Sequence, residues 1–168
     1  MAPEPRLEGG KRWVLEKAAN VTDEQITISP EAASQSVLLS RCSNAVIQVA
    51  GTCAALSVDG CTSVGVLLSD VKSSVEVVNC SRVKLQCTEN VSTIDINKTD
   101  SCQLILPSSI ARSVQVTTSL SQGVNVVELL DSEDGDSCET PIPDQFVTQW
   151  SETSRQFVTR PVEHAGSG

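Results

Sequence analysis

Apolar residues recur with a period of 19 residues between Val37 and Leu106. They form pairs spaced two residues apart, and two sets of four pairs alternate along the repeat. The sets are Val37/Leu39, Leu56/Val58, Val75/Val77 and Ile94/Ile96, then Ile47/Val49, Val66/Leu68, Leu85/Cys87 and Leu104/Leu106. A spacing of two is the side-chain period of a β-strand, and a fixed offset between repeats is typical of stacked coils. The pattern therefore predicts a right-handed parallel β-helix with coils of about 19 residues and two inward-facing sheets.

The repeat extends beyond these strands. With one residue added, the two sets continue to Val114/Val116 and Val124/Val126. Cys42, Cys61 and Cys80 also lie 19 residues apart, and Thr99 takes the next position. Small side chains at one corner can turn inward and stack at the strand spacing of about 4.8 Å. We therefore expect a buried column of reduced cysteines there.

The flanking segments do not follow the repeat, although the chain is short enough for one domain. We expect Trp13 to cover the open N-terminal end of the coils. The predicted all-β domain spans residues 1–168. It is divided into a loose N-terminus (1–10), β-helix coils (12–129), an acidic and proline-containing loop (130–143), a C-terminal hairpin (144–162) and a tail (163–168).

The predicted hairpin contains most of the aromatic residues, of which the chain has only two Trp, two Phe and no Tyr. A two-stranded hairpin is marginally stable alone, so its apolar side chains must pack on another surface. That surface is either the C-terminal end of the same β-helix or the same end of a second copy. We predict exchange between two copies, which would cover the open strand edges. The predicted dimerisation residues are Phe146, Val147, Trp150, Phe157 and Val158.

Composition restricts the function. A net charge of −9 disfavours nucleic acid and anionic membrane surfaces as partners. The cysteines lack CxxC spacing, and the acidic residues 131–139 lack the ligand spacing of an EF-hand, so we expect no metal or cofactor. The chain has one histidine, His164, and no facing carboxylate pair, which argues against a polysaccharide-cleaving β-helix enzyme or any other enzyme. Neither a signal peptide nor a membrane-spanning run is evident, and we expect a cytoplasmic location.

The two outward faces differ in charge. One includes Asp59, Glu76 and Asp95, whereas the other includes Gly65 and Lys84 and is neutral to basic. Broad, flat faces of this kind suit contact with another protein better than capture of a small molecule.

Four stretches carry a family resemblance: Leu7–Gly9 with Lys11–Trp13, Ile94–Cys102, Pro141–Phe146, and Thr159–Gly166. They resemble the C-terminal CARP domain of cyclase-associated proteins, in a short stand-alone form. The second stretch is similar to the family's Ile-Asn-Lys-Thr-Asp-Gly-Cys signature, with Ser101 where Gly is usual. The upstream oligomerisation, proline-rich and WH2 segments of long members are not recognisable in this sequence.

The resemblance implies a homodimer that binds monomeric actin. It would regulate filament turnover by promoting ADP-to-ATP exchange on actin monomers or by sequestering them, in the cytoplasm and with the cytoskeleton. Association with adenylyl cyclase is not expected from this domain alone. The resemblance places the actin-binding residues on the signature and the tail, and Lys84 on the less acidic face is a further candidate. The actin-binding set is Asn97, Lys98, Thr99, Asp100, Lys84, Thr159, Arg160, Glu163 and His164.

Two alternatives remain open. The related tubulin-cofactor branch regulates GTPases through a Gln-x-Arg arrangement, which this chain lacks. A purely scaffolding β-helix dimer is the other. Capture of monomeric actin, tubulin or a small GTPase would separate these three functions.

Overall fold

The computed structural model describes residues 3–163, which form strands and one short helix. In chain order these are β1 (Arg6–Glu8), β2 (Arg12–Glu16), β3 (Ala19–Ile28), β4 (Ser36–Ser40), β5 (Ser43–Cys53), β6 (Leu56–Asp59), β7 (Thr62–Val71), β8 (Ser74–Val78), β9 (Ser81–Asn90), β10 (Thr93–Asn97), β11 (Asp100–Pro107), α1 (Ser108–Ala111), β12 (Gln115–Ser119), β13 (Gln122–Leu129), β14 (Ser137–Pro141), β15 (Phe146–Ser151) and β16 (Gln156–Pro161).

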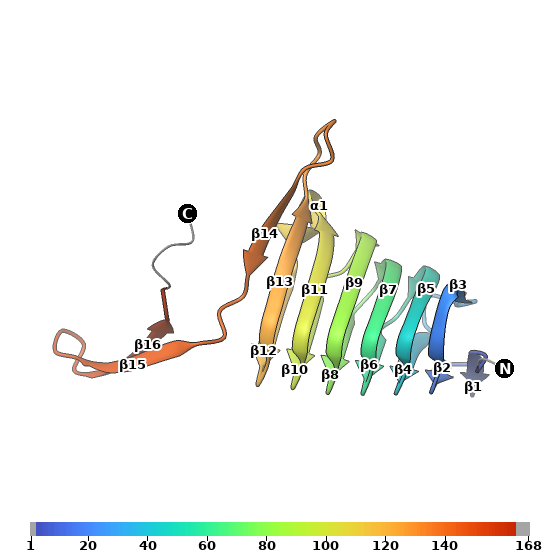
Figure 1. Ribbon diagram of the computed structural model, residues 1–168, viewed down its shortest axis with the longest axis horizontal. Coiled ribbons are helices and arrows are strands. Elements are labelled where there is room, and N and C mark those ends of the chain that lie inside the picture. Colours follow the sequence, from blue (N-terminus) through green and yellow to red (C-terminus); the bar gives the residue numbers. More distant parts are fainter. Residues whose placement is uncertain (1–2, 164–168) are drawn as a thin grey trace.

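The strands form two seven-stranded sheets (Figure 1). Sheet A has the order β1-β2-β4-β6-β8-β10-β12, and sheet B has the order β14-β13-β11-β9-β7-β5-β3. Neighbours from β2 to β13 are parallel, with Val37 opposite Leu56 and Leu56 opposite Val75. Both the parallel β-helix and its 19-residue register are therefore confirmed.

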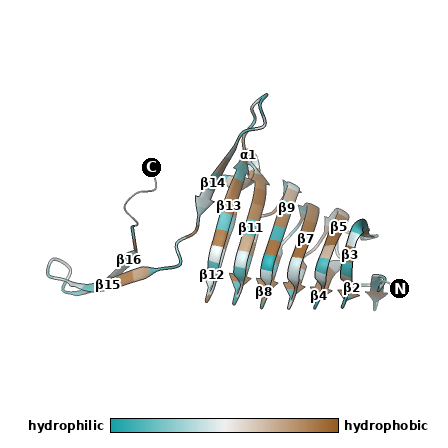
Figure 2. Ribbon diagram, viewed as in Figure 1, coloured by the Kyte–Doolittle hydropathy of each residue, from teal (hydrophilic) through white to brown (hydrophobic). Residues whose placement is uncertain are grey.

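The interior between the sheets contains all sixteen residues of the two sets, each at most 3% exposed. Hydrophobic residues follow the strands through the stack (Figure 2). Burial of a Val, Leu or Ile side chain stabilises the fold by about 1.5–3 kcal/mol. Because each inward position stacks on its equivalent one coil away, the coils share one continuous core.

The last coil differs from the prediction. Ile94 lies opposite Val116 and Leu104 lies opposite Val126, an offset of 22 residues (116 − 94 and 126 − 104) rather than 20. Helix α1 occupies the corner after β11, and its Ile110 is buried in the core. The helical turn consumes residues without advancing the next strand, so the predicted pairing of Ile94 with Val114 is wrong by two positions.

The predicted corner column is buried as expected. Cys42, Cys61, Cys80 and Thr99 are 0–5% exposed. The Cys61 thiol donates to the carbonyl of Leu39 over 3.6 Å, and the Cys42 backbone N–H donates to the Cys61 sulfur over 3.4 Å. These contacts satisfy corner backbone groups inside the core, where polar groups without a partner are costly.

Residues with positive φ lie beside this column. Arg41, Gly60, Asn79 and Lys98 have φ of 53, 66, 53 and 49°, and this left-handed conformation turns the chain from sheet A toward sheet B. Glycine and asparagine adopt it most readily, which explains two of the four. We call this set, which Lys17 and Leu120 extend to the two ends, the corner row.

Thiol labelling tests the burial of the cysteines. Six of the seven are buried and Cys138 is exposed. Burial raises the pKa of Cys53 to about 11 and that of Cys102 to about 12. Hydrogen bonds with Cys42 and Cys80 raise the pKa of Cys61, and the same bonds lower those of Cys42 and Cys80 to about 7, although neither sulfur is open to solvent.

The thiolate is the reacting species, and buried sulfur is reached only after opening of the fold. We therefore expect iodoacetamide to modify Cys138 rapidly. The other six cysteines should react at least about 10³-fold more slowly, as measured by peptide mass spectrometry. Unfolding in guanidinium should make all seven react. Native labelling of Cys61 at the rate of Cys138, or a Cys42–Cys61 disulfide, would contradict this expectation.

The N-terminal end is more ordered than expected. Within residues 1–10, predicted to be loose, β1 pairs antiparallel with β2. Trp13 packs against the core as predicted, and its indole N–H donates to the buried Gln35 side chain over 2.9 Å. Closure of this end therefore depends on a paired strand as well as on the aromatic ring.

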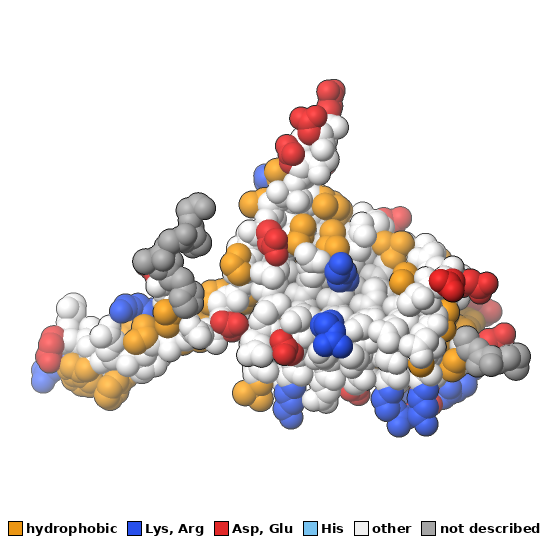
Figure 3. Space-filling view, viewed as in Figure 1, with side chains coloured by type: hydrophobic (Ala, Val, Ile, Leu, Met, Phe, Trp, Pro, Cys, Tyr) orange, Lys and Arg blue, Asp and Glu red, His pale blue; other side chains and the backbone are white. Residues whose placement is uncertain are grey.

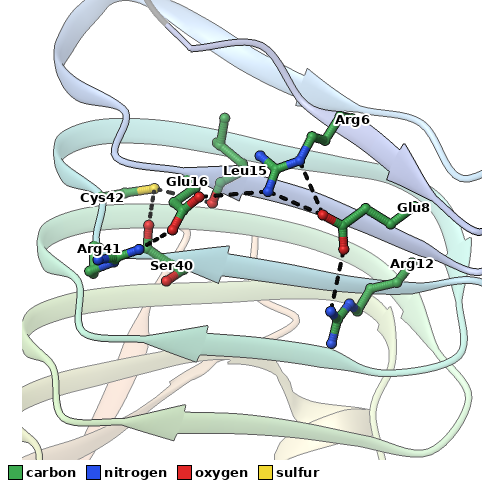
Figure 4. A network of polar contacts seen from close by, with 8 residues as sticks. All are labelled: Arg6, Glu8, Arg12, Leu15, Glu16, Ser40, Arg41 and Cys42. Atoms are coloured by element: carbon green, nitrogen blue, oxygen red, sulfur yellow. Dashed lines mark hydrogen bonds and ion pairs between the residues drawn. The ribbon is translucent and has the colours of Figure 1, made fainter.

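Ion pairs cross the same end of the molecule (Figure 4). Arg6 bridges Glu8 at 3.1 Å and Glu16 at 3.6 Å, and Arg41 also pairs with Glu16. The Arg41 hydrogen bond and charge lower the pKa of Glu16. Such exposed pairs add little stability individually, but they neutralise Arg41.

The C-terminal end carries two projections (Figure 1). The predicted loop 130–143 contains β14, which pairs antiparallel with β13 and follows an exposed acidic excursion. Beyond it, β15 and β16 form the predicted hairpin and extend away from the stack. Trp150 and Phe157 meet edge to face with ring centroids 5.5 Å apart. Within residues 3–163, no helix is long and apolar enough to span a membrane.

Candidate protein-binding surface

The signature-like stretch forms the corner between β10 and β11. Lys98 is exposed, and its backbone N–H donates to the carbonyl of Ser119 over 3.0 Å, which fixes the corner to the next coil. Asp100 is exposed and accepts from the Ser101 hydroxyl over 3.1 Å, while Asn97 is half-buried. Three of the four predicted contact residues are thus accessible to a partner.

Thr99 is the exception. It is 2% exposed, and its hydroxyl donates to the carbonyl of Asn97 over 3.1 Å. Its position in the cysteine column places it inside the coil, so the prediction that Thr99 contacts a partner is wrong for this folded state. Its role is to satisfy the corner backbone.

Lys98 differs from Arg41, another base of the corner row. Arg41 is paired with Glu16. Among the described residues, no carboxylate lies within 4.0 Å of the Lys98 ammonium. Lys98 therefore offers a charge that an acidic group of a partner can use.

Lys84 lies on a different part of the surface. It faces outward from β9, between Gly65 on β7 and Gln103 on β11. Because β9 and β11 are neighbours and β11 begins at Asp100, the Lys98 corner adjoins the edge of the sheet B face that carries Lys84.

Two of the four predicted contact residues from Thr159 to His164 belong to the hairpin. Thr159 and Arg160 belong to β16, where the Thr159 hydroxyl lies 2.9 Å from that of Thr148 and the Arg160 guanidinium donates to Gln149 over 2.9 Å. Glu163 is exposed, and His164 lies outside the described residues. Thr159 and Arg160 pair within the hairpin, inside its predicted bounds of 144–162, and are therefore not part of a free tail. Within one chain, β16 extends away from the stack and from the corner between β10 and β11 (Figure 1).

Exposed apolar side chains mark further contact surface. On the hairpin, Phe146, Trp150, Phe157 and Val158 are 57, 50, 70 and 43% exposed, and Val147 is half-buried. Sequence reasoning missed Leu120, which ends the corner row with φ 50° and is 80% exposed. It stands 22 residues after Lys98 (120 − 98), so the unexpected offset of the last coil concealed it.

The molecule is a parallel β-helical domain with broad, open outward faces and an exposed apolar hairpin. In the described part of the chain, no group of three or more His, Cys, Asp or Glu side chains is placed to hold a metal ion. Large, flat surfaces with accessible charged and aromatic residues are typical of protein-interaction domains.

Comparison with known proteins identifies the family. Residues 1–164 match the family described as "Adenylate cyclase associated (CAP) C terminal", and the chain belongs to this family. It is 33% identical over 165 residues to cyclase-associated protein 1 of Arabidopsis thaliana, covering 98% of this chain and 34% of that protein. Human adenylyl cyclase-associated protein 1 is 34% identical over 157 residues, covering 94% of this chain and 32% of that protein.

A solved structure shares the fold. The crystal structure of cyclase-associated protein from Cryptosporidium parvum superimposes with a TM-score of 0.86 and 28% identity, covering 96% of each chain. This chain spans about a third of the length of the curated relatives that it matches.

Proposed function

We propose that this chain binds monomeric actin and regulates filament turnover by promoting ADP-to-ATP exchange on the monomer or by sequestering it. The corner between β10 and β11 carries the proposal. This stretch resembles the family signature and exposes Lys98 and Asp100, and among the described residues no carboxylate lies within 4.0 Å of the Lys98 ammonium. Family membership supports it. The setting would be the cytoplasm, close to the cytoskeleton.

Exchange on this proposal needs no catalytic chemistry. A protein that binds open or nucleotide-free actin more tightly than ADP-bound actin shifts the equilibrium by that difference in affinity. A difference of about 1.4 kcal/mol changes the population ratio about tenfold. Equal affinity for both states would give sequestration alone.

The exposed hairpin supports a homodimer formed by its exchange. Strand β12 ends sheet A and, within residues 3–163, pairs only with β10, whereas the same end of sheet B is covered by β14. A groove lined by Leu120, Pro143 and Phe146 lies beside this open end. The hairpin of a second copy would supply both the missing strand partner and apolar cover.

A nucleotide-release assay tests the activity. Monomeric actin carrying a fluorescent ADP analogue is mixed with excess ATP, with and without the protein, and loss of fluorescence is followed. Faster release supports exchange. Unchanged or slower release with demonstrable binding supports sequestration. No capture of actin, with capture of tubulin or a small GTPase, would overturn the proposal.

Charge reversal tests the corner. Lys98→Glu should weaken actin binding several-fold, roughly the loss of one charge-assisted contact, and leave the melting curve unchanged because the side chain faces solvent. Binding is measured by fluorescence anisotropy at two salt concentrations. Lys17→Glu is the matched control, since Lys17 stands in the same corner row with φ 58° at the other end of the stack.

The expected result is weaker binding for Lys98→Glu and wild-type binding for Lys17→Glu. Equal affinity of both variants and the wild type would remove the corner from the site. Equal weakening of both would indicate a response to net charge rather than a local contact.

A further inference from the structure

Gly65 lies in a depression on the outward face of sheet B. The register sets Val46 opposite Gly65 and Gly65 opposite Lys84, on three adjacent strands. The depression has a volume of about 430 Å³. Its lining consists of Thr22, Asn44, Ala45, Val46, Ser63, Val64, Gly65, Arg82 and Lys84.

The fold does not require glycine at this position. The φ angle of Gly65 lies outside the left-handed region, and a Cβ built on it would meet no atom within 4 Å. Glycine within a strand destabilises the strand relative to other residues. It has more conformational freedom in the unfolded chain, and it has no side chain to pack in the folded one. An unneeded glycine in a strand often marks a place where another molecule approaches closely.

The chemistry of the depression is apolar with a basic rim. Val46 is 41% exposed on one side. Arg82 and Lys84 stand on the other, and the Arg82 guanidinium donates to the Ser63 hydroxyl over 2.9 Å, which orients it along the rim. No carboxylate lines the depression, although the chain carries a net charge of −9. Basic side chains stand near the middle of this face, and acidic ones lie on the excursion above it and also on the face beside the basic ones (Figure 3).

We propose that this depression, which we call the Gly65 notch, receives an apolar side chain of the actin monomer that is flanked by a carboxylate. The inference rests on the proposed function and extends it from the Lys98 corner onto the face of sheet B. The apolar side chain fills the space that glycine leaves and contacts Val46. The carboxylate accepts hydrogen bonds from Arg82 or Lys84.

Filling the notch separates this role from a structural one. Gly65→Thr adds a β-branched side chain to a strand with room for it, so the melting temperature should stay the same or rise. Actin binding should weaken roughly tenfold, since the side chain occupies the space of the partner's apolar group. Gly65→Ala should have a smaller effect, and Lys84→Glu should weaken binding without affecting folding.

Ser57→Thr is the control, because it enlarges an outward residue of sheet A by one methyl group. We expect wild-type binding from it. If the wild type binds actin and Gly65→Thr binds equally well, the notch is overturned while the proposed function stands. If the wild type fails to bind actin at all, both are overturned. If Gly65→Thr instead dissociates copies of the chain in sedimentation, the notch belongs to self-association and the actin assignment is wrong.

Discussion

Val77→Asp is expected to abolish the cooperative unfolding transition. The Val77 side chain is 0% exposed and stacks between Val58 and Ile96 in sheet A. A carboxylate there would lie among aliphatic side chains with no basic or hydrogen-bonding partner. The effective penalty of burying an unpaired ion is several kcal/mol, which is comparable with the total stability of a small domain, about 5–15 kcal/mol. The loss should be visible in thermal denaturation followed by circular dichroism.

Two further variants make this result specific. Val77→Ala should retain a cooperative transition and cost about 1–3 kcal/mol, because it removes two methyl groups without burying charge. Val78→Asp is the matched control, since Val78 is the next residue of β8, faces outward and is half-buried. A stable Val77→Asp combined with an unfolded Val78→Asp would show that the strand has the opposite face inward.

Truncation after Pro143 is expected to convert the proposed dimer into a monomer or an aggregating chain. It removes β15 and β16 with their exposed aromatic residues, and no hairpin then remains to cover the open edge of β12. Uncovered strand edges pair readily with other chains. Sedimentation velocity over a range of concentrations measures the change.

A point variant keeps this test informative if the truncated chain aggregates. Phe157→Ser leaves the backbone of β16 intact but removes a side chain that is 70% exposed in the single chain. It should raise the dimer dissociation constant by about tenfold or more, as loss of a buried aromatic anchor does. Thr153→Ala in the exposed hairpin turn is its control. A truncated chain that sediments as a well-behaved dimer would place the interface elsewhere.

The interior of the β-helix could be predicted from the sequence because its neighbours are encoded by position. In a stack of in-register parallel strands, the residue above Val58 is the residue 19 positions later, Val77. The two-residue alternation within a strand determines whether a side chain points inward or outward. The 19-residue repeat determines which residue of the next coil it stacks on. The same logic placed Thr99 in the cysteine column, which its burial confirms. The stretch Ile94–Cys102 could likewise be recognised as similar to the family signature, because it is one continuous segment of the sequence.

Other features depend on contacts that no period encodes. The 22-residue offset of the last coil arises because α1 occupies a corner. The alternation of inward and outward residues describes the strands only, so the length of a corner segment cannot be predicted from it. Whether a base is neutralised depends on which carboxylate lies across the coil, so Arg41 and Lys98 share a corner row but only Arg41 has a described partner, Glu16. The 19-residue period itself sets Val46 and Lys84 on either side of Gly65. The period does not encode the orientation of Arg82 toward Ser63 on the rim of the notch, nor the absence of a carboxylate from its lining. Sequence periodicity thus determined which side chains are buried, whereas the tertiary structure decided which surface groups meet, because the latter depends on distances between side chains that lie far apart along the chain.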